Sequence, residues 1–206
     1  MITEVYIASV SSCEIEKLRQ EYDKIRKRFI STDGGRVSER PENILGRVLL
    51  NRALIDKRAG DYTVEYVANE KPRLITKSGL CFNISHSGDL VALALSDREV
   101  GCDIQEIRPY NPRVAKRNYS EKETEFIENS EDKNKSFIRF WALKESVLKY
   151  TGKGISGGLS TYDFSPFASK DSFRAFGCSF YITEIKNMYF ALCHEADEFK
   201  LKITDF

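Results

Sequence analysis

The 206 residues are enough for one large domain or two small ones, and 41% hydrophobic with 31% charged residues is the balance of a soluble globular protein. The net charge of +1 gives no overall bias toward nucleic acid or a membrane, although the basic run Lys24–Arg28 could meet an anionic ligand. No apolar stretch approaches the roughly 20 residues that span a bilayer.

The cysteine and histidine content limits the kinds of site to expect. The five cysteines are odd in number and show no CxxC spacing, which argues against a disulfide framework or a zinc finger. His86 and His194 are the only histidines, so we do not expect a multi-histidine metal site. Met1–Val10 lacks the basic start and the cleavage site of a signal peptide. We therefore expect a cytoplasmic protein.

The first half of the chain alternates helical and strand patterns. Its predicted elements are a strand at 5–10, an amphipathic helix at 13–29, a loop of turn formers at 31–41, a helix at about 42–57, short strand-like pieces within 62–80, and strands at 81–84, 91–96 and 99–107. Both periodicities occur within one continuous stretch. This half therefore predicts helices packed on a sheet.

The second half repeats the mixture. Its predicted elements are helical segments near 113–118, 120–129 and 134–150, a glycine-rich loop at 151–158, and strands at 162–164, 173–184, 188–194 and 198–203. Helices and strands in both halves predict an α+β fold. The prolines within 108–112 mark the only plausible midpoint linker, between a first unit of residues 1–107 and a second of 108–206.

Asp103 and Gln105 belong to the predicted strand at 99–107. Because alternate side chains of a strand share a face, these two would point together, away from the apolar face, and Gly101 would leave space beside them. Two oxygen-bearing side chains could hold a hard cation such as Mg²⁺. A half-exposed strand with its polar residues outward explains the same pattern.

The helix around 137–149 carries three charges at or near an apolar stripe. The stripe is formed by Phe137, Phe140, Trp141 and Leu148. Lys144 falls within it, so this lysine must extend to solvent, find a partner or face an anionic ligand. Glu145 and Lys149 could be only a surface pair one turn apart. Function and simple packing remain open for this helix.

Several further residues could bind phosphate. The turn at Ser85–Gly88 offers hydroxyls, backbone N–H groups and the His86 imidazole, which suit a phosphate better than a catalytic serine because no GxSxG elbow is present. Lys71–Pro72 is either a rigid turn or a positioned cation, and Arg47 lies among apolar neighbours. The glycines at 152 and 154 do not form a P-loop.

Three motifs in order resemble one known family. Asn83-Ile84-Ser85-His86-Ser87, Gly101-Cys102-Asp103-Ile104-Gln105 and Trp141-Ala142-Leu143-Lys144-Glu145-Ser146 with Lys149 resemble the core motifs of the Sfp-type 4′-phosphopantetheinyl transferases. Their order and spacing match over residues 69–158, where Asn69–Pro72 resembles the family's Lys-Pro segment. The Leu45-Gly46-Arg47 segment resembles its first-helix motif more weakly.

The resemblance implies a fold, a reaction and partners. It implies two similar α/β lobes related by a pseudo-twofold, with coenzyme A and Mg²⁺, or alternatively Mn²⁺, in the cleft between them. The enzyme would move 4′-phosphopantetheine from coenzyme A to a serine of an apo acyl or peptidyl carrier protein, as in polyketide or nonribosomal peptide biosynthesis, and release 3′,5′-ADP. The length fits the monomeric type. Neither nucleic acid nor a membrane is an expected partner.

The resemblance also assigns roles to positions of this sequence. Asp103, Gln105 and Glu145 would be metal ligands, and Glu123 resembles the acidic residue that the family places near the metal. Glu145, Asp103 and Lys149 form the expected catalytic set. The residues expected to contact coenzyme A are Arg47, Lys71, Pro72, Ser85, His86, Asp103, Lys144 and Lys149. The carrier protein is expected to dock near 113–135 and the glycine-rich loop.

Gln105 departs from the Gly-Ile-Asp-Ile-Glu that many members carry. Because an amide oxygen is a weaker Mg²⁺ ligand than a carboxylate, this residue bears on metal affinity and metal preference. It also supports an alternative: a non-catalytic coenzyme A or nucleotide-binding protein that keeps the cleft. A second alternative is a protein-interaction domain whose charges are merely solvated, which would leave Lys144 in its apolar stripe without a reason.

Overall fold

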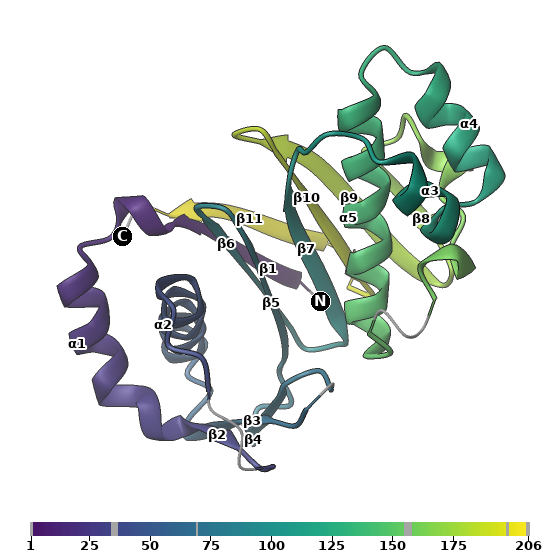
Figure 1. Cartoon of the computed structure of the whole chain (residues 1–206). Coiled ribbons are helices and arrows are strands. Elements are labelled where there is room, and N and C mark those ends of the chain that lie inside the picture. Colours follow the sequence, from purple (N-terminus) through teal and green to yellow (C-terminus); the bar gives the residue numbers. More distant parts are fainter. Residues whose placement is uncertain (1, 34–36, 69, 155–157, 197, 205–206) are drawn as a thin grey trace.

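The computed structural model describes residues 2–33, 37–68, 70–154, 158–196 and 198–204 as a mixed α+β protein (Figure 1). The strands are β1 (Ile2–Ser9), β2 (Phe29–Ser31), β3 (Tyr62–Tyr66), β4 (Arg73–Thr76), β5 (Cys81–Ser87), β6 (Leu90–Ser96), β7 (Val100–Glu106), β8 (Ser172–Ala175), β9 (Cys178–Ile185), β10 (Met188–His194) and β11 (Glu198–Thr204). The α-helices are α1 (Ile15–Ile25), α2 (Pro41–Asp56), α3 (Pro112–Asn118), α4 (Glu121–Asn129) and α5 (Lys133–Thr151). The predicted α+β class is confirmed.

Two four-stranded sheets form the centre of the molecule. Their strand orders are β11-β1-β6-β5 and β7-β10-β9-β8, and a separate three-stranded sheet has the order β2-β3-β4. The inner faces of the two large sheets share one apolar core, which includes Val5 and Ile7 of β1, Cys102 and Ile104 of β7, and Phe190 of β10. This core joins the two sheets face to face.

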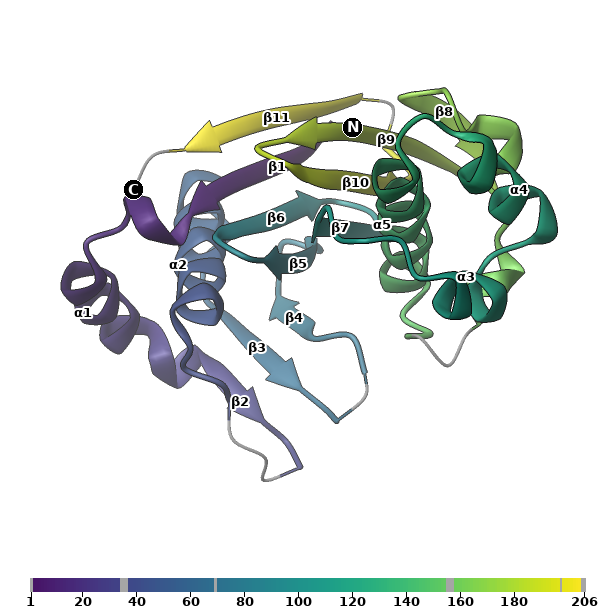
Figure 2. The same cartoon turned by 45° about the horizontal axis from the view of Figure 1, so that its top comes forward.

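Helices cover the outer faces of this sheet pair. The α2 helix packs on β5 and β6 and is covered by α1, while α5 packs on β7 and β10 beside α4 (Figure 1). The layers are thus helix, sheet, sheet and helix. The edges of the two large sheets meet where β5 lies beside β7 (Figure 2). Motifs from both halves of the sequence come together at this junction.

The α5 helix has well-defined ends. Asp132 precedes it as the N-cap, and its side chain accepts a hydrogen bond from the backbone N–H of Lys135 at 3.0 Å. Gly152 follows it with a φ of 70°, a left-handed conformation that glycine adopts without a steric penalty. The helix therefore ends just after Lys149, so this side chain lies in its last turn.

Most predicted elements are confirmed, and three differ. The helix predicted at 13–29 ends at Ile25 and continues as a 3₁₀ turn into β2. The strand predicted at 162–164 is wrong: residues 159–161 form a 3₁₀ turn and no strand follows before β8. The single strand predicted at 173–184 is a hairpin of β8 and β9, because Phe176 and Gly177 adopt φ values of 51° and 80° and reverse the chain. Three predicted segments are only partly described. Residues 34–36 of the loop at 31–41, residue 69 of the Lys-Pro segment and residues 155–157 of the glycine-rich loop lie outside the described residues.

Each of the two large sheets contains strands from both sides of the predicted midpoint at residue 107. The β7 strand, from the first half of the sequence, pairs with β10, whereas β11, from the second half, pairs in parallel with β1. The division into units of 1–107 and 108–206 therefore does not follow the sheet boundaries, and two lobes with a ligand cleft between them stay a prediction.

Candidate active site

Asp103 faces helix α5 from the middle of β7. The helix approaches this strand closely because Gly101 has no side chain: an added Cβ would lie 2.1 Å from the backbone oxygen of Ser146 and 2.3 Å from the backbone nitrogen of Tyr150. The predicted space beside Asp103 is thus occupied by the helix backbone. This contact brings the side chains of the last turns of α5 against β7.

Asp103, Lys149 and Ser85 form a compact polar group at this contact. The Lys149 Nζ lies 2.6 Å from Oδ1 of Asp103 and donates to the Ser85 hydroxyl at 2.8 Å, and that hydroxyl donates to Asp103 Oδ1 at 2.8 Å. Asp103 is only 4% exposed. Burial alone would lower the pKa of Lys149, but the attraction of Asp103 outweighs it and raises this pKa, so the ammonium stays charged.

The second carboxylate oxygen of Asp103 is unusual. Oδ2 is buried and has no hydrogen-bond partner among the described residues. A buried, unpartnered carboxylate oxygen is costly, which is typical of a group that awaits a ligand. It is therefore a natural point for a cation to bind.

Glu145 lies close enough to Asp103 for the two charges to repel. Burial, and then the negative charge of Asp103, raises the pKa of Glu145, while Lys149 opposes this shift. The Gln105 side chain is half-buried and extends from the same face of β7 as Asp103, two residues further along the strand. Two neighbouring carboxylates and an amide oxygen match the hard ligands of Mg²⁺.

This donor set fits a Mg²⁺ ion that shares its ligands with a substrate. The described residues hold no group of three or more His, Cys, Asp and Glu arranged as a metal site. Mg²⁺, however, usually binds proteins through one or two carboxylates and completes its shell with phosphate oxygens and water. Asp103 and Glu145 satisfy that requirement.

The polar group adjoins a cleft with three connected cavities. Cavities of 160 Å³ and 230 Å³ share Pro72, Asn83 and Ile84, and Arg47 and His86 line the first while Lys71 and Lys149 line the second. A third, of 880 Å³, continues from Lys71 and Pro72 along β4. Cationic side chains from distant parts of the sequence therefore share one opening.

Arg47 is the most deeply placed of these cations. It is 3% exposed and donates to the Ser38 carbonyl at 2.6 Å, to the Tyr22 hydroxyl at 3.2 Å and to the Tyr66 hydroxyl at 3.3 Å. The guanidinium carbon also lies 5.5 Å from the ring centres of Tyr22, Phe29 and Tyr66. Neutral partners hold this cation in place without cancelling its charge, so it can attract an anion.

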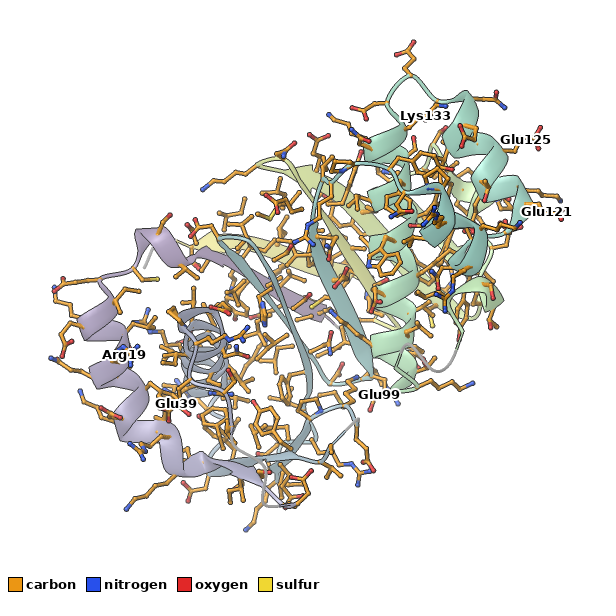
Figure 3. All side chains as sticks on the ribbon, viewed as in Figure 1. Arg19, Glu39, Glu99, Glu121, Glu125 and Lys133 are labelled. Carbon is orange, nitrogen blue, oxygen red and sulfur yellow. The ribbon has the colours of Figure 1, made fainter. Side chains whose placement is uncertain are left out.

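Lys71 and His86 lie nearer the surface. The Lys71 Nζ bonds to Glu99 Oε2 at 2.7 Å and to the Val100 carbonyl at 2.8 Å. Figure 3 places Glu99 at the C-terminal end of α5, beside the cleft. His86 is exposed as a residue, yet partial loss of hydration, aided by the charge of Lys149, lowers its pKa below the usual value, so the neutral imidazole is favoured.

Lys144 and Glu123 lie apart from this group. Both are 0% exposed, and the Lys144 Nζ lies 2.8 Å from Glu123 Oε2 while it also donates to the carbonyls of Leu159 and Tyr162. Glu123 accepts from the backbone N–H groups of Ser120 and Phe164, each at 2.8 Å. These three contacts use the three N–H donors of the Lys144 ammonium. The lysine pairs internally, so the structure does not bring Lys144 and Glu123 into the group of Asp103, Ser85 and Lys149, and their predicted roles toward the ligand stay a prediction.

Some cleft residues were not assigned a role from the sequence. Asn43 and Tyr66 line the cavity that holds Arg47, and Asn83 lines two cavities. Tyr66 and Asn43 show no local pattern that distinguishes them from surface residues. The Asn83, Ser85 and Ser87 side chains do repeat every second position, which places them on one face of β5.

Comparisons with known proteins agree with this geometry. A family model described as "4'-phosphopantetheinyl transferase superfamily" matches residues 99–203. The 4'-phosphopantetheinyl transferase psf-1 of Bacillus pumilus is 30% identical over 170 residues, which cover 77% of this chain and 72% of that protein. HetI of Nostoc sp., another 4'-phosphopantetheinyl transferase, is 34% identical over 158 residues, or 72% of this chain and 62% of the relative.

A third relative and a solved structure complete the comparison. The 4'-phosphopantetheinyl transferase Sfp of Bacillus subtilis is 35% identical over 83 residues, or 39% of this chain and 37% of Sfp. The alignment with the solved structure of the holo-[acyl-carrier-protein] synthase of Thermotoga maritima covers 48% of this chain and 64% of the synthase chain, at 17% identity. Its TM-score of 0.31 is too low to add to the assignment. The family match and the coverage of the Bacillus pumilus enzyme suffice: the chain belongs to the 4'-phosphopantetheinyl transferase superfamily, whose enzymes transfer phosphopantetheine to carrier proteins.

Proposed function

We propose that the protein transfers 4′-phosphopantetheine from coenzyme A to a serine of an apo acyl or peptidyl carrier protein and releases 3′,5′-ADP. One observation supports this above the others: Asp103, with its buried and unpartnered Oδ2, lies beside Glu145 and Lys149 at the edge of a cation-lined cleft. Membership of the family supports the same reaction.

The cation-lined cleft suits the charges of coenzyme A. Arg47 and His86 line one cavity, and Lys71 and Lys149 line the next. Together they can bind a phosphate group and a pyrophosphate in separate places. Ser85 belongs to this set through its contacts with Lys149 and Asp103. Pro72 lines both cavities and restricts the backbone next to Lys71.

We propose Mg²⁺, with Mn²⁺ as an alternative, as the metal. Asp103 and Glu145 would hold it, with Gln105 as a third donor, directly or through water. The bound ion would neutralise the negative charge of the pyrophosphate. The Gln105 amide contributes no charge, so we expect weaker metal binding than a carboxylate at this position would give.

The residues of the chain would then position and deprotonate the nucleophile. The carrier serine oxygen forms a bond to the β-phosphorus of coenzyme A, and the bond from that phosphorus to the bridging oxygen breaks, so 3′,5′-ADP leaves with the bridging oxygen. Lys149 and Lys71 bind the phosphate oxygens on which charge develops. Glu145 takes the serine proton, directly or through a water molecule.

The test is the intact mass of an apo carrier protein after incubation with this protein, coenzyme A and Mg²⁺. We expect the mass of one phosphopantetheine group to be added and the gain to be lost with EDTA. Glu145→Gln should abolish transfer in a folded protein, whereas Glu198→Gln, at an exposed position of β11, should not. Near-normal transfer by a folded Glu145→Gln variant would contradict the role of Glu145.

The neutral Gln105 supports one competing function, a coenzyme A or nucleotide-binding protein without turnover. Binding of coenzyme A with no mass gain on several different carriers would favour it.

For the transferase, we propose that the carrier docks near residues 113–135 and that the protein acts as a cytoplasmic monomer. Within the described residues, no helix has the length and apolarity to cross a membrane.

A further inference from the structure

The β5 and β7 strands lie side by side although they belong to different sheets. Each is the edge strand of its sheet, and they approach at the junction seen in Figure 2. No backbone ladder joins them among the described strand pairs. The edge of β7 that faces β5 still presents backbone N–H groups, and buried N–H groups need acceptors.

Side chains of β5 supply these acceptors at every second residue. The backbone N–H of Cys102 donates to Asn83 Oδ1 at 2.9 Å, that of Ile104 to the Ser85 hydroxyl at 3.2 Å and that of Glu106 to the Ser87 hydroxyl at 3.1 Å. We call this set of three contacts the side-chain ladder. Its three acceptor residues are 5% to 7% exposed.

The middle rung of this ladder is part of the candidate active site. Besides accepting from Ile104, the Ser85 hydroxyl donates to Asp103 Oδ1 and accepts from Lys149 Nζ. A backbone ladder would hold neighbouring strands about 4.8 Å apart and leave no room for a hydroxyl between them. The side-chain ladder keeps β7 further from β5, and Ser85 can then reach the Asp103 carboxylate.

We propose that Asn83 and Ser87, the two outer rungs, are positioning residues for the metal-binding carboxylate of Asp103. They fix the β7 backbone one residue before Asp103 and three residues after it. With both rungs in place, Oδ1 of Asp103 is held by Ser85 and Lys149, and Oδ2 is left without a hydrogen-bond partner among the described residues, where a cation can bind it. This inference rests on the metal site of the proposed function.

The test removes one rung at a time. In Ser87→Ala the Glu106 N–H loses its acceptor, and Ser87 lines none of the three cavities of the cleft, so no ligand contact is removed. Asn83→Ala removes the other outer rung together with a side chain that lines two of the cavities, so Ser87→Ala is the decisive variant. The matched control is Ser96→Ala, because Ser96 is 2% exposed and its hydroxyl accepts from Thr3 and from the Arg98 N–H at the far end of β6.

Two measurements separate positioning from stability. Binding of Mn²⁺ in the presence of coenzyme A, followed by the electron paramagnetic resonance of free Mn²⁺, should weaken about threefold to tenfold in both rung variants, as expected for one lost hydrogen bond. Ser96→Ala should bind Mn²⁺ like the wild type, even if its unfolding temperature falls as much as that of the rung variants. Ser87→Thr, which keeps the hydroxyl, should restore binding. Amide exchange should accelerate at Glu106 in Ser87→Ala and at Cys102 in Asn83→Ala, and at neither residue in the control.

The outcomes distinguish the two proposals. If the wild type binds no Mn²⁺ with coenzyme A present, the metal site of the proposed function fails, and this inference fails with it. If the wild type binds Mn²⁺ and both rung variants bind it equally well while the Glu106 or Cys102 amide exchanges faster, the metal site stands. The ladder then only stabilises the fold, and the inference alone is wrong.

Discussion

Replacing Lys144 with methionine tests the structural role of the buried ion pair with Glu123. Both side chains are 0% exposed, and their charged atoms lie 2.8 Å apart. The substitution fits the volume but leaves the Glu123 carboxylate buried without a cation. Removing one partner of such a pair typically costs about 3–5 kcal/mol of unfolding free energy. The Leu159 and Tyr162 carbonyls also lose their donor.

The expected loss is large enough to measure by thermal denaturation. For a chain of this size, each kcal/mol lowers the unfolding temperature by about 2–4 °C, so Lys144→Met should unfold some 6–20 °C earlier. The double variant Glu123→Gln, Lys144→Met should recover part of the loss, because no unpaired charge remains buried. Lys135→Met, which breaks the half-exposed pair with Glu184, is the control and should change the unfolding temperature little.

A different result would refute this reasoning. If Lys144→Met unfolds at nearly the wild-type temperature but raises the KM for coenzyme A severalfold, Lys144 contacts the ligand and not Glu123. We expect the opposite at a temperature where the variant is folded, namely an unchanged KM. The comparison distinguishes the coenzyme A contact that the family resemblance implies for Lys144 from the internal ion pair that the contacts support.

Three further predictions concern other residues near the cleft. Gly101→Ala should prevent normal folding, because its methyl would meet the backbone of α5. Gly46→Ala should be tolerated better, because its methyl would meet side-chain atoms alone, with Ile84 Cγ2 nearest at 2.9 Å; soluble yield and circular dichroism compare the two variants. Glu145→Gln should stabilise the ligand-free protein near pH 7. Because the folded-state pKa of Glu145 is raised, the wild type loses stability as the pH rises toward and through that pKa, and the variant does not. The extra unfolding free energy of the variant, measured by urea titration, should therefore shrink toward pH 4. Equal gains at both pH values would contradict this. Glu99→Gln should lower the KM for coenzyme A about twofold to fivefold, because Lys71 loses a competing anion; a KM that rises would show that Glu99 helps to place Lys71.

The residues brought together by β7 and α5 were predictable from the sequence. Alternation along the strand places Asp103 opposite the apolar residues of β7, and the resemblance adds Glu145 and Lys149. The ion pair of Lys149 with Asp103 and the charge repulsion between Glu145 and Asp103 support their grouping. The internal pairing of Lys144 was not predictable, because its partner lies on another helix, 21 positions earlier in the chain. Helical spacing reports which face a residue occupies and not what covers that face.

Errors in the elements have equally local causes. Residues 162–164 look strand-like by composition, but the carbonyl of Tyr162 bonds to Lys144 and the N–H of Phe164 to Glu123, so side chains of α5 and α4 take backbone groups that a sheet would need. The turn between β8 and β9 depends on positive φ at Phe176, a conformation that its side chain disfavours. Gly177 alone was a weaker signal than the continuous apolar pattern around it.

The parallel pairing of β1 with β11 ties the folding of the molecule to a contact between distant segments. Ile2 lies opposite Glu198 and Ala8 opposite Thr204, so the first large sheet lacks its outer strand until residues 198–204 have been synthesised. Until then β1 has an unpaired edge, which is a place for aggregation during biosynthesis. Closing so long a loop is slow, but once closed it joins both halves in one cooperative unit. Loss of the strand at 198–204 should therefore lower the yield of soluble protein far more than its small contribution to the cleft suggests.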